Sequence, residues 1–190
     1  KAGSLLPQGT TIKTGDKSEV YLVNHGDTTS TIVANSEVSI AEVSTTGSGG
    51  SVTKQTTTLD LKSGNIVAKL NPAKKAVNNY SVRTPKGVAA ARGTVFTVSY
   101  NGANYTIAVV NGTVNVTPVG TSVNDGLTHT MEAGQVALSE SGFELGRSYS
   151  VAELNSQGRN DLATQLSGIL AVAVATVAVA AENNIGGTTA

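Results

Sequence analysis

The feature of this sequence that most restricts its fold is a long succession of short β-branched runs, each ended by glycine, asparagine, aspartate or proline. Examples are residues 19–23, 56–61 and 66–70, which are separated by turn-forming residues. β-branched side chains suit the pleated surface of a sheet, and glycine and asparagine suit tight turns. Strands therefore follow one another, which predicts a sandwich, a barrel or a β-solenoid and excludes alternating βαβ units.

Turn signals set the expected connections between these strands. Asn-Gly pairs at 101–102 and 111–112 join three strand-like runs between residues 95 and 116, and Asn-Gly is a strong hairpin signal. We therefore expect two successive hairpins there. We also expect a turn at 63–65, a flexible Gly/Ser-rich loop at 45–51 and a late strand at 143–145.

The character of the chain changes near residue 147. The segment Ser150-Val151-Ala152-Glu153 fits a capping box, in which the serine hydroxyl accepts from a free N–H and the glutamate reaches back. Gly158 can end this short helix, and a second helix is expected from about Asn160. We therefore divide the chain into a β domain, residues 1–146, and a C-terminal segment, residues 147–190, that is helical with an apolar tail.

The tail contains an uncharged apolar run, residues 168–181. As a helix it would be about 21 Å long, shorter than the ~30 Å hydrocarbon core, so we do not expect it to span a membrane unless residues 162–166 extend it. Valine and alanine are nearly balanced, which leaves helix and strand both open. Because the run is apolar on all sides it should be buried, either against its own β domain or against a neighbouring subunit. The candidate packing or assembly residues are Leu162, Leu166, Ile169, Leu170, Val172, Val174, Val177 and Val179.

Composition restricts the partners. Only 14% of residues are charged and the formal net charge is zero. Nucleic acid binding needs a basic surface, and the small group formed by Lys74, Lys75 and Lys86 does not supply one. Low net charge also leaves little repulsion between copies of the chain, which favours self-association.

One segment carries a family signature. Residues 80–98 read as a strand ending in Thr-Pro, a short Gly-led strand ending in Arg-Gly-Thr, and a strand of the form x-Phe-x-Val. Together with Gly-x-Val-x-Val near residue 112 and Ala-Gly-Gln near residue 134, this pattern resembles the FecR domain, over about residues 9–140. The residues that carry the resemblance are Thr84, Pro85, Gly87, Arg92, Gly93, Thr94, Phe96, Gly112 and Gly134.

The resemblance implies an elongated, twisted, sandwich-like or solenoid-like stack of strands, mainly β, with the helical segment as an appendage. It also implies kinship with periplasmic signal transducers of siderophore-linked iron uptake. Those carry an anti-sigma segment and a membrane helix before the domain, and neither precedes it in this sequence. For Arg92 we expect a structural role, with its five donors on backbone carbonyls or a carboxylate, and the alternative is that it grips a ligand.

Catalytic and metal-binding patterns are not found. The chain has no cysteine, and His25 and His129 lie in polar turn-like stretches, where we expect solvated loop side chains. The acidic turns at 124–126 and 182–184 lack the ligand count of an EF-hand. We therefore predict no enzyme activity, no cofactor and no metal.

The preferred interpretation is an extracellular or cell-surface structural subunit, made by removal of a signal peptide before Lys1, that polymerises with copies of itself through its apolar tail and the ends of its β stack. A trimmed version of a longer chain would begin in the same way. The alternative is a periplasmic or cell-surface sensor or scaffold that binds another protein, as the resemblance implies.

Overall fold

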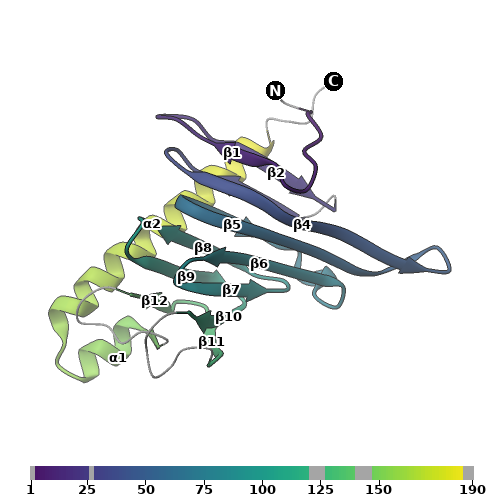
Figure 1. Cartoon of the computed structure of the whole chain (residues 1–190). Helices are drawn as coiled ribbons and strands as arrows, with labels where there is room; N and C mark the ends of the chain where they lie inside the picture. Colours follow the sequence, from purple (N-terminus) through teal and green to yellow (C-terminus); the bar gives the residue numbers. More distant parts are fainter. Residues whose placement is uncertain (1–2, 26–27, 120–126, 140–146, 186–190) are drawn as a thin grey trace.

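The computed structural model of the chain describes residues 3–25, 28–119, 127–139 and 147–185, with side chains described up to residue 180 (Figure 1). Most of it is β-structure, with two helices at the C-terminal end. The elements are β1 (Thr11–Lys13), β2 (Val20–Asn24), β3 (Thr28–Ile32), β4 (Glu37–Ser48), β5 (Ser51–Lys69), the 3-10 turn η1 (Pro72–Lys74), β6 (Asn78–Thr84), β7 (Gly87–Ala91), β8 (Val95–Tyr100), β9 (Tyr105–Asn111), β10 (Thr113–Pro118), β11 (His129–Glu132), β12 (Val136–Leu138), β13 (Ser148–Tyr149), α1 (Val151–Ser156) and α2 (Asn160–Ile185).

The strands form two layers that share β5. The first sheet has the order β1-β4-β5-β6-β7-β10-β11, and the second has the order β2-β3-β5-β8-β9-β12-β13. Within this part of the chain all neighbours are antiparallel except β5 and β6. The expected fold class, mainly β with a helical apolar appendage at the C-terminus, is confirmed. The expected strand at 143–145 lies outside the described residues. The expected domain boundary, between residues 146 and 147, falls at the edge of the same undescribed segment and stays a prediction.

The turn expected at residues 63–65 is wrong, because β5 runs through it. Residues 55–60 of β5 pair with β6 in the first sheet, and residues 64–69 pair with β8 in the second. Gly64 has φ +95°, and a Cβ atom there would lie 2.1 Å from Ser36 Oγ. The glycine therefore lets the strand pass from one sheet to the other over Ser36, instead of reversing it.

The two Asn-Gly pairs behave differently. The first joins β8 to β9 in the expected hairpin, which pairs Tyr100 with Tyr105. The second does not make a hairpin, because β10 pairs with β7 and β11 in the other sheet. Gly112 has φ +82°, and a Cβ atom there would come within 3.0 Å of Thr94 Oγ1. At this Asn-Gly pair the chain passes from β9 in the second sheet to β10 in the first. The positive φ of Gly112 and its close packing against Thr94 allow this crossing, just as they would allow a hairpin turn.

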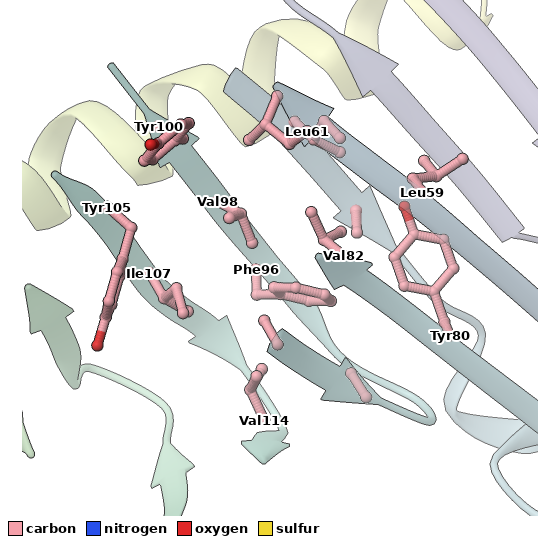
Figure 2. Close-up of a cluster of buried hydrophobic side chains, with 14 of the residues drawn as sticks. Leu59, Leu61, Tyr80, Val82, Phe96, Val98, Tyr100, Tyr105, Ile107 and Val114 are labelled. Carbon is pink, nitrogen blue, oxygen red and sulfur yellow. The ribbon is translucent and has the colours of Figure 1, made fainter. Parts of the chain in front are cut away.

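The core lies between the two sheets (Figure 2). Alternate residues of each strand point inward, so that Leu59, Tyr80 and Val82 of the first sheet meet Phe96 and other side chains of the second. The rings of Tyr80 and Phe96 meet edge to face, with centroids 6.1 Å apart. The Tyr80 hydroxyl forms a 2.7 Å hydrogen bond with Ser30 Oγ, and burial raises its pKa, so its one polar atom is satisfied while neutral.

The loop expected at 45–51 is strand except at its tip. β4 and β5 continue as a two-stranded arm to Ser48 and Ser51, and only Gly49 and Gly50, with φ of +59° and +80°, make the turn. We name residues 41–54 the β-ribbon. It projects beyond the neighbouring strands (Figure 1). Glycine and serine in this segment therefore mark a tight hairpin tip and not a flexible loop.

The predicted helix signals at the C-terminal end are confirmed. Ser150 Oγ accepts from the backbone N–H of Glu153 at 3.2 Å and caps α1, and Gly158, with φ +72°, follows the helix. The Glu153 carboxylate accepts from Arg147, which replaces the expected return bond to the cap. The segment 168–181, left open between helix and strand, is helical throughout.

Candidate binding surfaces

The two histidines, expected as solvated loop residues, are both engaged or enclosed. His25 follows β2 in a turn with φ +55°, where its Nδ1 lies 3.0 Å from Thr45 Oγ1 and its Nε2 lies 3.4 Å from the Thr56 carbonyl. The side chain therefore ties the β2–β3 turn to the base of the β-ribbon. Such a role is structural, and it holds the ribbon against the second sheet.

His129 lies on β11 and not in a loop. It pairs with Val116 and points toward the interior, where both ring nitrogens are buried with no hydrogen-bond partner among the described residues. Burial lowers the pKa of its imidazole because an apolar setting disfavours the charged form. Since alternation along β11 decides this placement, the polar neighbours in the sequence gave a misleading signal.

A metal-binding cluster is not found in the described part of the chain, which has no group of three or more histidine, cysteine, aspartate or glutamate side chains close enough to share an ion. The acidic turn at 124–126 and the side chains of residues 182–184 lie outside that part.

The β-ribbon is the first such surface. Hydrogen bonds between β4 and the segment containing β1 end at Ile40, and the parallel pairing of β5 with β6 begins at Gln55. Side chains from Glu42 to Lys54 are all exposed. The ribbon therefore has open strand edges, which are templates for pairing with another chain. Residues of the expected flexible loop thus form a projecting two-stranded hairpin, and the sequence signal that could have shown this is the threonine-rich stretch on both sides of Gly49-Gly50.

The exposed side of α2 is the second surface. The expected assembly residues divide between its two sides. Leu166 is fully buried against the sheet, whereas Val172, Val174 and Val179 are 65%, 52% and 47% exposed. The expectation that the whole apolar run is buried is therefore wrong for these three valines in a single chain. The remaining members of the set, Leu162, Ile169, Leu170 and Val177, are half-buried.

A hollow of about 390 Å³ lies under the middle of α2. Its sheet wall carries Thr97, Ser99 and Thr106, and its helix wall carries Ile169 and Ala173 among others. The apolar helix therefore lies over a polar part of the second sheet.

α2 is also long and apolar enough to cross a membrane, by length and composition: the stretch Asn160–Ala180 has a mean hydropathy of 2.0, with 17% of the tested window buried. The helix extends over 26 residues and includes residues 162–166, so it is longer than the 14-residue apolar run on which no span was expected.

The third surface is a hollow of about 370 Å³ on the outer face of the first sheet, beside Arg92. Arg92 is exposed, and hydrogen bonds or ion pairs to its side chain are absent from the described parts of the chain. The expected partners of its five donors, carbonyls or a carboxylate, are therefore not found among the described residues, and the structural role stays a prediction. Arg92 comes directly after β7 and is exposed, whereas Ala91, the last residue of that strand, is buried.

Comparison with known proteins gives the family. Residues 10–115 match the sequence model described as FecR protein, and this range is more than half of the chain. The chain belongs to the FecR family. The resemblance read from the motifs of residues 80–98 is therefore confirmed, and no curated protein matches the chain.

Solved structures share the fold. Two crystal structures of a candidate anti-sigma factor from Parabacteroides distasonis ATCC 8503, at 1.65 and 2.50 Å resolution, superpose with TM-scores of 0.54 and 0.55 at 12% identity. Each comparison covers 74% of this chain and 59% of the other, so the chain spans about three fifths of the length of that protein. At this identity the likeness shows a shared fold alone.

The signature residues of the FecR domain are mostly structural in this chain. Thr84 Oγ1 donates to the Gly87 carbonyl and closes the turn that contains Pro85. A Cβ atom on Gly93 would lie 2.9 Å from Pro72 Cα, so only glycine lets η1 pack there. The hydroxyl of Thr94 donates to the Thr113 carbonyl at 2.7 Å. Phe96 is fully buried and Gly134 adopts φ +83° beside β11, whereas the exposed side chain of Arg92 has no hydrogen bond or ion pair to the residues that the structure describes.

Proposed function

We propose that this FecR domain is a non-enzymatic, extracytoplasmic module that binds a partner protein, as a sensor or scaffold in FecR-type signalling. The observation that carries the proposal is the β-ribbon, residues 41–54, which presents open strand edges outside the sandwich. The family membership and the fold shared with a candidate anti-sigma factor support a signalling context.

The chemistry of the ribbon fits strand addition. Proteins that do not use a sheet edge commonly protect it with charges, proline or a covering loop. Between residues 41 and 54 the ribbon has two charged side chains, Glu42 and Lys54, and no proline. Threonine, serine and valine fill most of the rest, and they favour extended pairing. A partner segment can therefore add as a further strand, with backbone hydrogen bonds supplying affinity and side chains such as Val43 and Val52 supplying selectivity.

The same proposal places the domain in the periplasm or at the cell surface, with no cofactor and no nucleic acid partner. The zero net charge supports the lack of a nucleic acid partner, because phosphate backbones attract proteins that have basic surfaces.

A second candidate function is the self-assembling structural subunit. The exposed valines of α2, at positions 172, 174 and 179, favour it, because a second copy could cover them. Assembly of this kind uses α2 and not the ribbon, so the two functions make separate predictions.

The experiment places a photo-crosslinking amino acid at one of three positions in the chain expressed in its own cells. Val43 reports on the ribbon, Val172 reports on α2, and exposed Lys62 is the control outside both surfaces. We expect Val43 to crosslink to one protein of different sequence, identified by mass spectrometry, and Lys62 to give no discrete product.

Electron microscopy and sedimentation of the purified chain complete the test. A monomer supports the partner-binding proposal, particularly if Val43 crosslinks and Val172 does not. Filaments that disappear when the chain is truncated after Gly158, together with crosslinks from Val172 to a second copy, would establish the structural subunit instead. Absence of any Val43 crosslink overturns the proposed role of the ribbon.

A further inference from the structure

Two arginines on the outer face of the first sheet differ in their partners. Arg83 donates from Nε to Asp60 Oδ1 at 2.6 Å and from Nη2 to Asp60 Oδ2 at 3.0 Å, so a carboxylate neutralises it in a two-pronged pair. Arg92 directly follows β7, which lies two strands away from β5, and it has no such pair in the described ranges. A guanidinium has five donors in a planar fork that matches a carboxylate, and those of Arg92 face solvent.

The surface beside Arg92 is concave. Ala90 pairs with Ser81 of β6 and with Asn115 of β10, so a short side chain stands between longer ones. This arrangement leaves the hollow of about 370 Å³ that Arg92, Asn79, Ser81, Thr113 and Asn115 also line. Its volume lies at the lower end of the 300–1,000 Å³ that is usual for small-molecule sites.

The hollow offers donors and no carboxylate. Asn115 Oδ1 already accepts from Thr130 Oγ1 at 2.9 Å, which leaves the Nδ2 donors of Asn115 available. Lys74 and Lys75 belong to the turn that packs against Gly93, the residue after Arg92, and they add positive charge on that side. Glu132 pairs with Thr113 one strand further out and is not part of the lining.

We propose that this hollow binds the carboxylate of a small polar ligand. Arg92 donates two hydrogen bonds to the carboxylate oxygens in a two-pronged pair, and the side-chain amides of Asn79 and Asn115 hydrogen-bond the neighbouring polar groups of the ligand. An acidic sugar and an acidic amino acid share this chemistry, and the site is separate from the β-ribbon, so the proposal does not depend on the protein partner.

The test is a titration of the ¹⁵N-labelled full chain, followed by two-dimensional NMR of backbone and side-chain amides. The probes are glucuronate with glucose as its neutral match, and N-acetylglutamate with N-acetylglutamine as its neutral match. We expect saturable shifts centred on residues 79, 90, 92 and 115 with one of the two acids, with a Kd of about 1 mM, and none with its neutral match up to about 10 mM. Which acid saturates the site identifies the ligand class.

Two variants test the role of the guanidinium. Arg92→Gln should weaken binding at least tenfold, because it removes the charge and the fork. Arg92→Lys should bind with intermediate strength, because it keeps the charge alone. Arg83→Gln is the matched control, since it lies on the same face outside the hollow, and it should leave the Kd unchanged. Equal affinity in the wild type and in Arg92→Gln, or no saturation with either acid, overturns the proposal.

Discussion

The two halves of α2 are similarly apolar but are held differently. Residues 160–170 lie on an apolar part of the second sheet, where Ala163 and Leu166 join Ala108, Val136 and Leu138 in one buried cluster. Of residues 171–180, Ala173 alone belongs to this cluster, and Val172, Ala173 and Thr176 border the hollow whose sheet wall carries hydroxyl side chains. The difference shows that burial of an apolar helix depends on the surface beneath it as much as on its own sequence.

The comparison also explains why the second half is exposed without being polar. Ala173 still points toward the sheet and is buried, so the helix continues in contact with it. In the described part of the chain, Val172, Val174 and Val179 face away from the sheet and are left exposed. The first half of α2 is therefore an integral part of the domain. The second half has an exposed apolar side that lipid or another protein can contact.

The largest expected effect comes from the first half. Replacing Leu166 with alanine removes a fully buried side chain and should lower the free energy of unfolding by about 2–5 kcal/mol. Urea denaturation followed by circular dichroism measures it. Val172→Ala, on the exposed side of the same helix, should change the value by less than about 0.5 kcal/mol. Equal losses in the two variants would abolish the distinction between the halves.

The next effect concerns α1, which connects β13 to α2 and buries Leu154 in the same cluster. Ser150→Ala removes the acceptor for the Glu153 N–H and should cost about 1 kcal/mol of stability. Ser150→Asp keeps an acceptor at the cap and should stay close to the wild type. A stability loss in the aspartate variant as large as in the alanine variant would show that the cap does not matter.

A smaller effect of opposite sign is expected under the second half. Thr97 is nearly buried and lines the hollow below α2, so Thr97→Val places a methyl group where a hydroxyl stands. We expect a gain of about 0.5–1 kcal/mol in the free energy of unfolding, because the apolar helix then meets apolar surface. Thr113→Val, exposed on the other sheet, is the control. A loss of stability in Thr97→Val would show that the hydroxyl is needed.

The smallest effect is expected on the outward side. The double variant Val172→Lys/Val179→Lys should change the free energy of unfolding of the monomer by less than about 0.5 kcal/mol, since both side chains are already in solvent. The same denaturation assay, together with sedimentation, measures it. A loss above about 2 kcal/mol would mean that these valines are buried in a larger assembly, and it would favour the structural-subunit function.

Much of the fold could be predicted from local patterns. The strands at 19–23, 95–100 and 105–110, the Ser150 cap and the stop at Gly158 follow from alternation, turn residues and capping chemistry, which act over a few neighbours. Connections could not be predicted in the same way. Gly64 and Gly112 have the same local signals as hairpin glycines, and only their contacts with Ser36 and Thr94 make them crossings.

The candidate sites could be predicted less well than the strands, because they depend on neighbours across the sheet. Whether Arg92 is paired depends on whether a carboxylate stands beside it across the sheet, as Asp60 does for Arg83, and the sequence does not display that neighbour. His129 was misplaced because its direction follows from the register with Val116 and not from the polarity of its neighbours. Alternation along a strand indicates which face of the sheet a side chain lies on. The pairing between strands determines which side chains it contacts.

The sharing of β5 by both sheets has a mechanical consequence. The tip of the β-ribbon is the beginning of this strand, and the same strand then bonds to β4 and β6 in one layer and to β3 and β8 in the other. A pull on the tip along the strand would load all of these ladders in shear at once. A force applied to the ribbon would thus be distributed over the strand pairs of both sheets.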